Sequence, residues 1–441
     1  MALGYGPKDL FEEIGIYSPD IIGITMMTFN YRNHYKLINE IKSRFKNIAI
    51  AVGGAHVSLM REKVLADCPD IDYGVVLEGE KTMLELCQGN DLSKIGGLIY
   101  RKNSKIVFNG ERSFIENLDD IPYPKYGSFE LDKYPYPNSP ERFRDIPIVS
   151  SRGCPYQCIF CPVKSAIGEK FRYRSPENML KELGYWYEKG YRTFWFADDN
   201  FTLLKERVSK FCDLIDKSGM KDLSLGCGNG IRADRVDIEL LKKMKNAGFK
   251  VLAFGVESGS DRILKIYKKS ETLLQIETGI KNAIELGFSV GLCFLIGAPG
   301  ETPQDVEKSF ELARRYPIDG VRFYHITPYP KTELYEWIEK NSYFVAEPAE
   351  YLNSVISFQN NPVYKTPELP LNVRKKLFKK AKKIENYIEN NFYARKFVKL
   401  GTPKLIAGVL ASLYRTSIIN RILNLQIRGK KLREHIKKLY I

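Results

Sequence analysis

Short apolar runs alternate with amphipathic stretches along most of this chain of 441 residues. Between residues 147 and 340 there are six such runs, at 148–150, 193–196, 223–227, 251–256, 290–296 and 321–326. Helical spacing lies between them, for example over 237–247 and 273–286. Strands that alternate with helices pair in parallel, so the pattern predicts an α/β fold with a partial (β/α)6 barrel. Any site should lie at the carboxyl ends of these strands.

Two further regions flank the predicted barrel at 147–344. Residues 1–118 contain apolar runs at 20–25, 48–52 and 73–77, which predict a small Rossmann-like parallel α/β domain with a hairpin over 97–110. The segment 119–146 is rich in proline and tyrosine, which indicates a linker or a strap over the barrel. Residues 345–441 predict a basic helical domain.

The net charge of +15 belongs almost entirely to the last part of the chain. Residues 371–441 hold 19 Lys or Arg and three Asp or Glu. Amphipathic stretches at 374–388, 405–414 and 418–427 fit a helical cap on the barrel, association with an anionic membrane surface, or, less well, RNA binding. No apolar run is long enough to cross a bilayer, and eight scattered cysteines indicate a reducing compartment. We therefore expect a cytoplasmic protein. Peripheral attachment to a membrane through the basic segment is a further expectation.

The most specific chemical signal is a group of three cysteines in the run SRGCPYQCIFCP, at Cys154, Cys158 and Cys161. Three soft thiolates on one loop suit either zinc or an iron–sulfur cluster. A structural zinc site needs four ligands, and no other Cys or His lies within forty residues on either side. A 4Fe–4S cluster held by three cysteines leaves one iron open to a small molecule. The sequence therefore favours such a cluster, with a zinc site or an electron-transfer iron–sulfur protein as alternatives.

The spacing C-x3-C-x2-C, with Phe160 before the last cysteine, resembles the cluster loop of the radical S-adenosylmethionine (SAM) superfamily. The later runs DDNF, GIRAD, GVESG and GAPGE, in that order, resemble its cobalamin-binding branch. This resemblance implies that the open iron chelates SAM and that one electron cleaves SAM to a 5′-deoxyadenosyl radical, which abstracts hydrogen from the substrate. It also implies an electron donor of the ferredoxin or flavodoxin type.

The same resemblance assigns roles to polar residues at the strand ends. It implies that Asp198 and Asp199 hold the SAM amino group and that Arg232 pairs with its carboxylate. Glu257 and Ser258 would contact the ribose or methionine end, and Gly297 the adenine.

Structural roles are the alternative for each of these residues. One aspartate could cap the next helix, and Glu257 could pair with Arg232. His325 and Tyr324 at the sixth strand are candidates for chemistry, although a structural histidine and a wall tyrosine are the simpler readings.

The N-terminal unit resembles the later half of a cobalamin-binding domain, through Gly53 and Gly54 after one strand and Gly79 after the next. Glycines there let the backbone approach the corrinoid. Such a domain normally opens with two more strands, so the resemblance predicts a late start or a remnant that no longer binds cobalamin. Either case predicts an exposed sheet edge with apolar surface.

The expected reaction is cobalamin-dependent radical methylation or another C–H functionalisation of a small molecule or lipid. A cobalamin-free radical oxidoreductase or cyclase is the second reading. A methylthiotransferase is less favoured, because that family carries three N-terminal cysteines and only Cys68 and Cys87 stand there.

Overall fold

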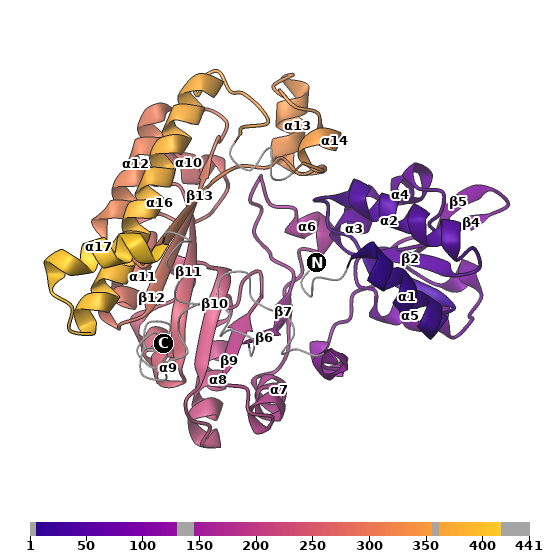
Figure 1. The fold of residues 1–441 in the computed structure, drawn as a ribbon, viewed down its shortest axis with the longest axis horizontal. Helices are drawn as coiled ribbons and strands as arrows, with labels where there is room; N and C mark the ends of the chain where they lie inside the picture. Colours follow the sequence, from indigo (N-terminus) through magenta and orange to yellow (C-terminus); the bar gives the residue numbers. More distant parts are fainter. Residues whose placement is uncertain (1–5, 130–144, 355–360, 416–441) are drawn as a thin grey trace.

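The structure is a computed structural model that describes residues 6–129, 145–354 and 361–415. Its N-terminal unit, indigo to purple in Figure 1, is a five-stranded sheet in the order β1-β2-β3-β4-β5. The first three strands are parallel, and β4 and β5 form an antiparallel hairpin. Asn103 and Ser104 turn this hairpin with φ values of 49° and 65°, as a two-residue connection requires. The strands are β1 (Ile21–Thr25), β2 (Ala49–Gly53), β3 (Tyr73–Val75), β4 (Leu98–Lys102) and β5 (Lys105–Phe108).

Helices cover both sides of this sheet, and they are α1 (Pro7–Tyr17), α2 (Tyr31–Arg44), α3 (Ala55–Met60), α4 (Glu62–Asp67) and α5 (Glu80–Cys87). Strand β1 is the edge strand of the described sheet, and all three of its isoleucines are only partly buried. Ile16 and Tyr17 at the end of α1 are 74% and 84% exposed. The expected exposed edge with apolar surface is therefore present.

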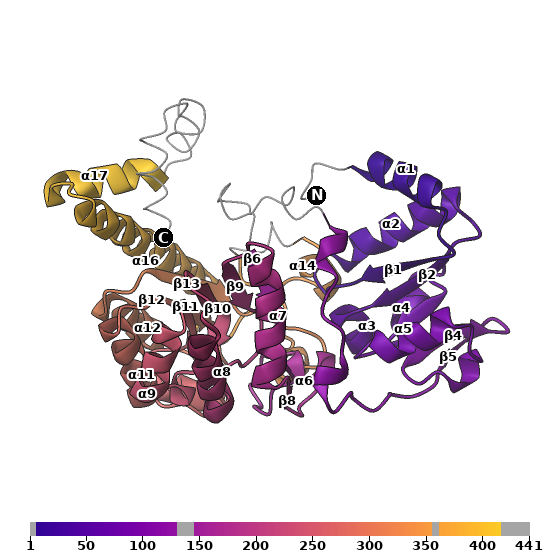
Figure 2. The ribbon, with the colours of Figure 1, turned by 90° about the horizontal axis from the view of Figure 1, so that it is seen from below.

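The central unit is a six-stranded, wholly parallel sheet in the order β13-β12-β11-β10-β9-β6. Its strands are β6 (Asp145–Ile148), β9 (Thr193–Phe196), β10 (Ser224–Ile231), β11 (Phe249–Glu257), β12 (Ser289–Ile296) and β13 (Gly320–His325). Helices lie against one face and bury the largest hydrophobic core (Figure 2), namely α7 (Pro176–Glu188), α8 (Lys205–Ser218), α9 (Ile238–Asn246), α11 (Leu273–Glu285) and α12 (Pro303–Arg315). The predicted partial barrel is confirmed.

Two barrel strands differ from their predictions. Strand β10, expected at 223–227, runs on to Ile231. The first barrel strand was expected at 148–150 and instead ends at Ile148. The amide of Ser150 donates 2.6 Å to the carboxylate of Asp198, so this residue leaves the strand ladder. Pro147 is tolerated because β6 is an edge strand and needs no amide donor on its open side.

The C-terminal part is helical, as predicted, with α13 (Glu333–Lys340), α14 (Pro348–Tyr351), α16 (Leu371–Lys399) and α17 (Lys404–Arg415). The long helix α16 runs beside β13 at the edge of the barrel sheet (Figure 1). The Glu385 carboxylate accepts the amide of Phe323 at 2.7 Å, and the Lys382 ammonium donates to the Phe323 carbonyl at 3.4 Å. None of the described helices is long and apolar enough to cross a membrane. The predicted stretch 418–427 and most of the strap, residues 130–144, lie outside the described residues.

Candidate active site

The three cysteines lie on one loop at the carboxyl end of β6. A short hairpin, β7 (Ser151–Arg152) with β8 (Arg172–Tyr173), closes the base of this loop, and α6 (Val163–Ala166) follows the last cysteine. Gly153 has φ +82°, and a Cβ there would clash with the carbonyl of Lys170, so only glycine fits at this bend. The amide of Cys161 donates to the carbonyl of Cys158 at 3.1 Å, which tightens the turn between them.

Distant parts of the chain anchor the cysteine loop. The amide of Ile159 donates to the carbonyl of Tyr267 at 3.1 Å, and the carbonyl of Ile159 accepts from the amide of Leu334 at 2.9 Å. The ring of Tyr156 lies 3.6 Å from the guanidinium carbon of Arg232. The loop is therefore fixed by contacts from the segments after β10, β11 and β13, rather than by its own turns.

The thiols of Cys154, Cys158 and Cys161 fit a cluster better than a single ion. Each is partly exposed, and burial raises the pKa of each thiol, to about 12 at Cys161. A bound metal offsets this cost, because its positive charge favours the thiolate. Among the described residues, no three His, Cys, Asp or Glu side chains converge as the ligands of one metal ion must. Three thiols on one loop are the donor set expected for an iron–sulfur cluster with an open iron, and the assignment of the cluster to them stays a prediction.

The carboxylate of Asp198 makes hydrogen bonds that stabilise the base of this loop. Its carboxylate accepts the amide and hydroxyl of Ser150 at 2.6 and 2.5 Å and the hydroxyl of Ser151 at 2.7 Å. The buried Arg207 guanidinium lies 3.6 Å away and donates to the Ser150 carbonyl. Asp198 is 2% exposed, so its acceptor positions face the protein.

Asp199, in contrast, has no hydrogen-bond partner among the residues that the structure describes. Burial, and then the charge of Asp198, raise the pKa of its carboxyl group to about 6. The next residue, Asn200, is 1% exposed, and neither atom of its amide has a partner in the described part of the chain. The helix-capping alternative for the aspartates is wrong, because Leu204 is the N-cap of α8. Asp199 is the free carboxylate at this strand end.

Glu257 forms an ion pair with a residue that the sequence did not reveal. Its carboxylate lies 3.1 Å from the ammonium of Lys269, which is 6% exposed and also lies 3.6 Å from Glu271. Glu257 has φ +65°, a strained conformation for a non-glycine residue. A Cβ at Gly255 would come within 2.8 Å of the Glu257 carboxylate, so the glycine makes room for this pair.

The expected pairing of Glu257 with Arg232 is therefore wrong. The guanidinium of Arg232 donates to Asp234 at 2.9 Å and to the carbonyls of Lys269 and Ser270 at 2.5 and 2.9 Å. These contacts leave Arg232 engaged in holding the segment after β11. Ser258 is fully buried, and its hydroxyl accepts the amide of Ser260 at 3.2 Å.

The two candidates on β13 lie on opposite faces of the sheet. Tyr324 points away from the helices and is 46% exposed, in register with Leu295 of β12. His325 points toward the helices, where it stacks on Phe378 of α16 with ring centres 4.0 Å apart. Its Nδ1 lies 3.3 Å from Nε of Arg374. This placement favours the structural role of His325, and its part in the chemistry stays a prediction.

Gly297 is packed by a residue from the C-terminal helix. Its φ is +121°, and a Cβ would clash with the guanidinium of Arg374. Arg374 is completely buried and donates to the carbonyl of Ile296 at 2.7 Å and of Tyr364 at 3.2 Å. The amide of Gly297 donates to Glu301, whose carboxyl pKa burial raises to about 7. These contacts account for the glycine without a ligand, and its contact with adenine stays a prediction.

The glycines of the N-terminal unit follow the predicted strand ends. A Cβ at Gly54 would meet the carbonyl of Met26 at 2.9 Å, so close packing on the end of β1 requires this glycine. A Cβ at Gly53 would lie 3.7 Å from the Cβ and from the carbonyl of Val75, and a Cβ at Gly79 would lie 3.2 Å from the Val75 side chain. The buried hydroxyl of Thr28 and Nδ1 of His56, near the same strand ends, have no partner in the described residues. These ends therefore offer unpartnered polar atoms to a ligand.

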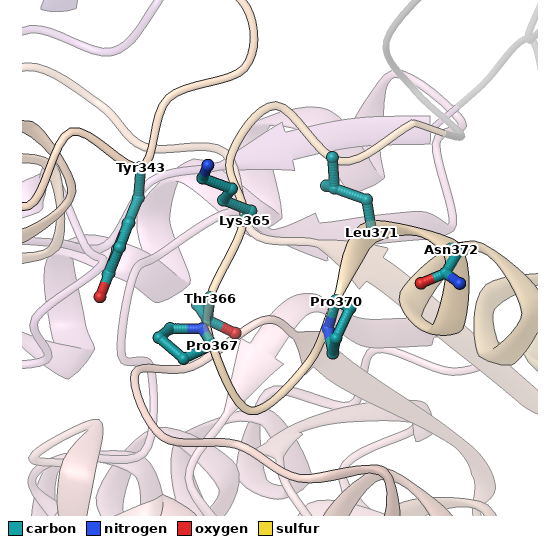
Figure 3. A pocket seen from close by; sticks show the side chains of 7 residues that line it. All are labelled: Tyr343, Lys365, Thr366, Pro367, Pro370, Leu371 and Asn372. Carbon is teal, nitrogen blue, oxygen red and sulfur yellow. The ribbon is translucent and has the colours of Figure 1, made fainter.

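A separate surface cavity of about 550 Å³ lies where the chain enters α16 (Figure 3). It is lined by Tyr343, Lys365, Thr366, Pro367, Pro370, Leu371 and Asn372. None of these is a predicted site residue, and the cysteine loop does not contribute to it. We assign it no role in the chemistry.

Comparison with known proteins agrees with the motifs. Residues 148–313 match the radical SAM superfamily, and residues 3–87 match the B12 binding domain. Over 340 residues the chain is 34% identical to an uncharacterized methyltransferase of Pyrococcus horikoshii, a match that covers 76% of this chain and 72% of that one. Over 338 residues it is 28% identical to the anaerobic magnesium-protoporphyrin IX monomethyl ester cyclase of Rubrivivax gelatinosus, covering 74% of this chain and 59% of the cyclase.

Solved structures show the same architecture. The cobalamin-dependent S-adenosylmethionine radical enzyme OxsB aligns over 99% of this chain and 69% of its own, with a TM-score of 0.71 and 18% identity. At that identity the likeness concerns the fold alone.

Proposed function

This chain belongs to the radical SAM superfamily, in the branch that carries a B12 binding domain, and on that premise we propose that it is a cobalamin-dependent radical methyltransferase. The observation that carries the proposal is the loop of Cys154, Cys158 and Cys161, with a free carboxylate and a buried ion pair at neighbouring strand ends. A 4Fe–4S cluster supplies one-electron cleavage of SAM, and cobalamin supplies a methyl carrier. The protein binds and orients both and excludes water from the radical.

We assign the amino-acid end of SAM to Asp199 and Lys269. Asp199 carries an unpartnered carboxylate, which suits an ammonium group. Lys269 offers an ammonium beside Glu257, and its charge acts on the thiol of Cys158, so it lies near the cluster loop. Arg232, expected to bind the SAM carboxylate, donates to Asp234 and to two backbone carbonyls. Lys269 replaces it in this assignment, because its ammonium makes a hydrogen bond only to Glu257 among the described residues and keeps further donors for a ligand. Glu257 remains our assignment for the ribose or methionine end.

Replacing Asp199 by asparagine should weaken SAM binding without loosening the cysteine loop. We expect Asp199→Asn to weaken SAM binding about tenfold or more, because a charged hydrogen bond is worth roughly 1.5–3 kcal/mol. Its iron content should equal that of the unchanged protein. The matched change Asp198→Asn should instead lower the free energy of unfolding by about 3 kcal/mol, since it loosens a buried network. Isothermal titration with SAM, iron analysis and urea unfolding measure these quantities, and equal SAM affinity in both variants would refute the assignment.

Cobalamin retention tests the reaction class. We expect the anaerobically reconstituted protein to keep about one hydroxocobalamin per chain after desalting, and to transfer the labelled methyl group of SAM to a product. Loss of all cobalamin on desalting would favour a cobalamin-free cyclase or oxidoreductase. The similarity to the magnesium-protoporphyrin cyclase supports that second candidate. Either chemistry requires a one-electron donor, for which we propose a ferredoxin or flavodoxin.

We further propose that helix α17 contacts an anionic membrane surface, which would bring the enzyme near a lipid substrate. Its small residues Ala407 and Ala411 are buried against α16, while Leu405, Ile406 and Val409 are 92%, 51% and 59% exposed. An outward aliphatic face within a segment of such high positive charge matches the lipid interface.

Vesicle binding tests this surface. Sedimentation with liposomes containing phosphatidylserine should capture the protein, and the double variant Leu405→Ser, Val409→Ser should release it. The control is Leu274→Ser, since Leu274 is also highly exposed, at 79%, but lies on α11 away from the basic segment. Equal capture of all three proteins would contradict the proposal.

A further inference from the structure

The strands β7 and β8, which enter and leave the cysteine loop and are called its two stems, each carry one arginine. Arg152 stands in β7, two residues before Cys154, and Arg172 stands opposite it in β8. Both guanidinium groups turn toward the N-terminal unit. The Arg172 side chain is 2% exposed, and its Nε and one terminal nitrogen have no partner among the described residues. A buried guanidinium with open donors depends strongly on the one carboxylate that it does meet.

That carboxylate is Glu78, which follows β3 of the N-terminal sheet. It accepts from Arg152 at 2.9 Å, from Arg172 at 2.6 Å and from the amide of Ile115 at 2.8 Å. Its side chain is 10% exposed. Burial raises the pKa of the Glu78 carboxyl group, but these three hydrogen bonds outweigh burial and hold the pKa below its usual value. Glu80, two residues later, pairs with Arg152 at 2.6 Å.

Glu78 also lies in the short segment after β3 that resembles part of a cobalamin site, between Leu77 and Gly79. Leu77 before it has φ +61°, and Gly79 after it starts α5. Helix α3, which follows the neighbouring Gly54, packs against α6, directly after the last cysteine. The strand ends of the N-terminal sheet and the cysteine loop therefore meet at one interface. At its centre, the single carboxylate of Glu78 contacts the arginines of both β7 and β8, and only Arg152 has a second carboxylate, Glu80.

We propose that Glu78 is a positioning residue that fixes the cysteine loop against the strand ends of the N-terminal unit and transmits occupancy of one site to the other. The part that concerns cobalamin rests on the proposed function. The physical reason is that backbone movement at Leu77–Gly79 displaces the carboxylate that both loop stems require. By linkage, a ligand that orders 77–79 also orders the loop, and the cluster in turn favours that ligand.

The test measures how fast the reconstituted enzyme loses iron to a chelator, with and without hydroxocobalamin. In Glu78→Gln we expect iron release about tenfold faster than in the unchanged protein, because the buried Arg172 loses its carboxylate partner and Arg152 keeps only Glu80. Arg152→Gln, which removes the more exposed arginine, should accelerate release less. Glu111→Gln is the matched control, since Glu111 pairs with Arg61 inside the N-terminal unit. Hydroxocobalamin should slow release from the unchanged protein and from Glu111→Gln, but not from Glu78→Gln.

Iron release from Glu78→Gln at the rate of Glu111→Gln, in the absence of cobalamin, overturns the proposal. If the unchanged protein binds no cobalamin while Glu78→Gln still loses iron faster, the anchoring role stands and the cobalamin assignment fails. If Glu78→Gln binds cobalamin and its release slows as in the unchanged protein, the transmission between sites is refuted. Should Glu78→Gln fail to fold by circular dichroism, the rate for Arg152→Gln decides the anchoring role.

Discussion

Replacing Cys158 by alanine is expected to remove the iron–sulfur cluster and all SAM cleavage. Cys158 is the middle one of the three proposed ligands, and the remaining two thiols cannot hold a cluster that already uses only three. Iron should fall from about four atoms per chain to a trace after desalting, and 5′-deoxyadenosine should no longer form above background. Iron and sulfide analysis, with chromatography of the SAM products, measures both.

The matched control for this change is Cys212→Ala. Cys212 is completely buried in the core on α8, so its loss leaves a small cavity and no missing ligand. We expect a cost of about 1 kcal/mol in unfolding free energy and a full iron content. Iron retained by Cys158→Ala, or lost equally by Cys212→Ala, would contradict the assignment of the cluster to this loop.

Replacing Arg374 by alanine should have the largest effect on stability. The change empties a fully buried site and removes the arginine donor from the carbonyls of Tyr364 and Ile296, of which Ile296 keeps the amide of Ile326 at 3.3 Å. It also removes the positive charge that lowers the carboxyl pKa of Glu301, which is already raised to about 7 by burial. Loss of a buried charge partner costs about 3–5 kcal/mol, and we expect a loss of that size in urea unfolding.

Lys376→Ala on the same helix is the control for Arg374→Ala. Lys376 is exposed, and alanine is at least as good a helix former, so unfolding should change by less than about 0.5 kcal/mol. A loss of similar size in both variants would mean that α16 itself, rather than its arginine, holds the loop after β12.

The strands and the metal ligands could be predicted from the sequence because their signals are local. Periodicity placed four of the six barrel strands close to their observed bounds, and Thr193–Phe196 was identified without error, whereas β6 was expected too late and β10 four residues too short. The three cysteines are separated by only three and two residues, so spacing alone predicts them as ligands, and that prediction is not tested by the structure. Boundaries at residues 118, 146 and 344 stay predictions, since no finding tests where one domain ends.

The partners of the site residues could not be predicted, because they come from distant segments. Arg374 reaches Ile296 across 78 residues, and Glu78 reaches Arg172 across 94. Lys269 follows α10 (Asp261–Ile266), where nothing in its neighbourhood distinguishes it from other lysines. Its burial results from the ion pairs with Glu257 and Glu271, which form only once the sheet is assembled. Asp198 and Asp199 are equal candidates from the sequence alone, and only three-dimensional contacts distinguish them.

The contact of Glu385 and Lys382 with Phe323 has a consequence for self-association. An open sheet of six strands has an edge whose free amides and carbonyls can pair with a strand from another molecule. On β13 a carboxylate and an ammonium from α16 occupy one amide and one carbonyl of that edge. Helix α16 therefore hinders the pairing of β13 with a strand from another molecule. Removal of α16 should favour aggregation even where the cysteine loop is unchanged.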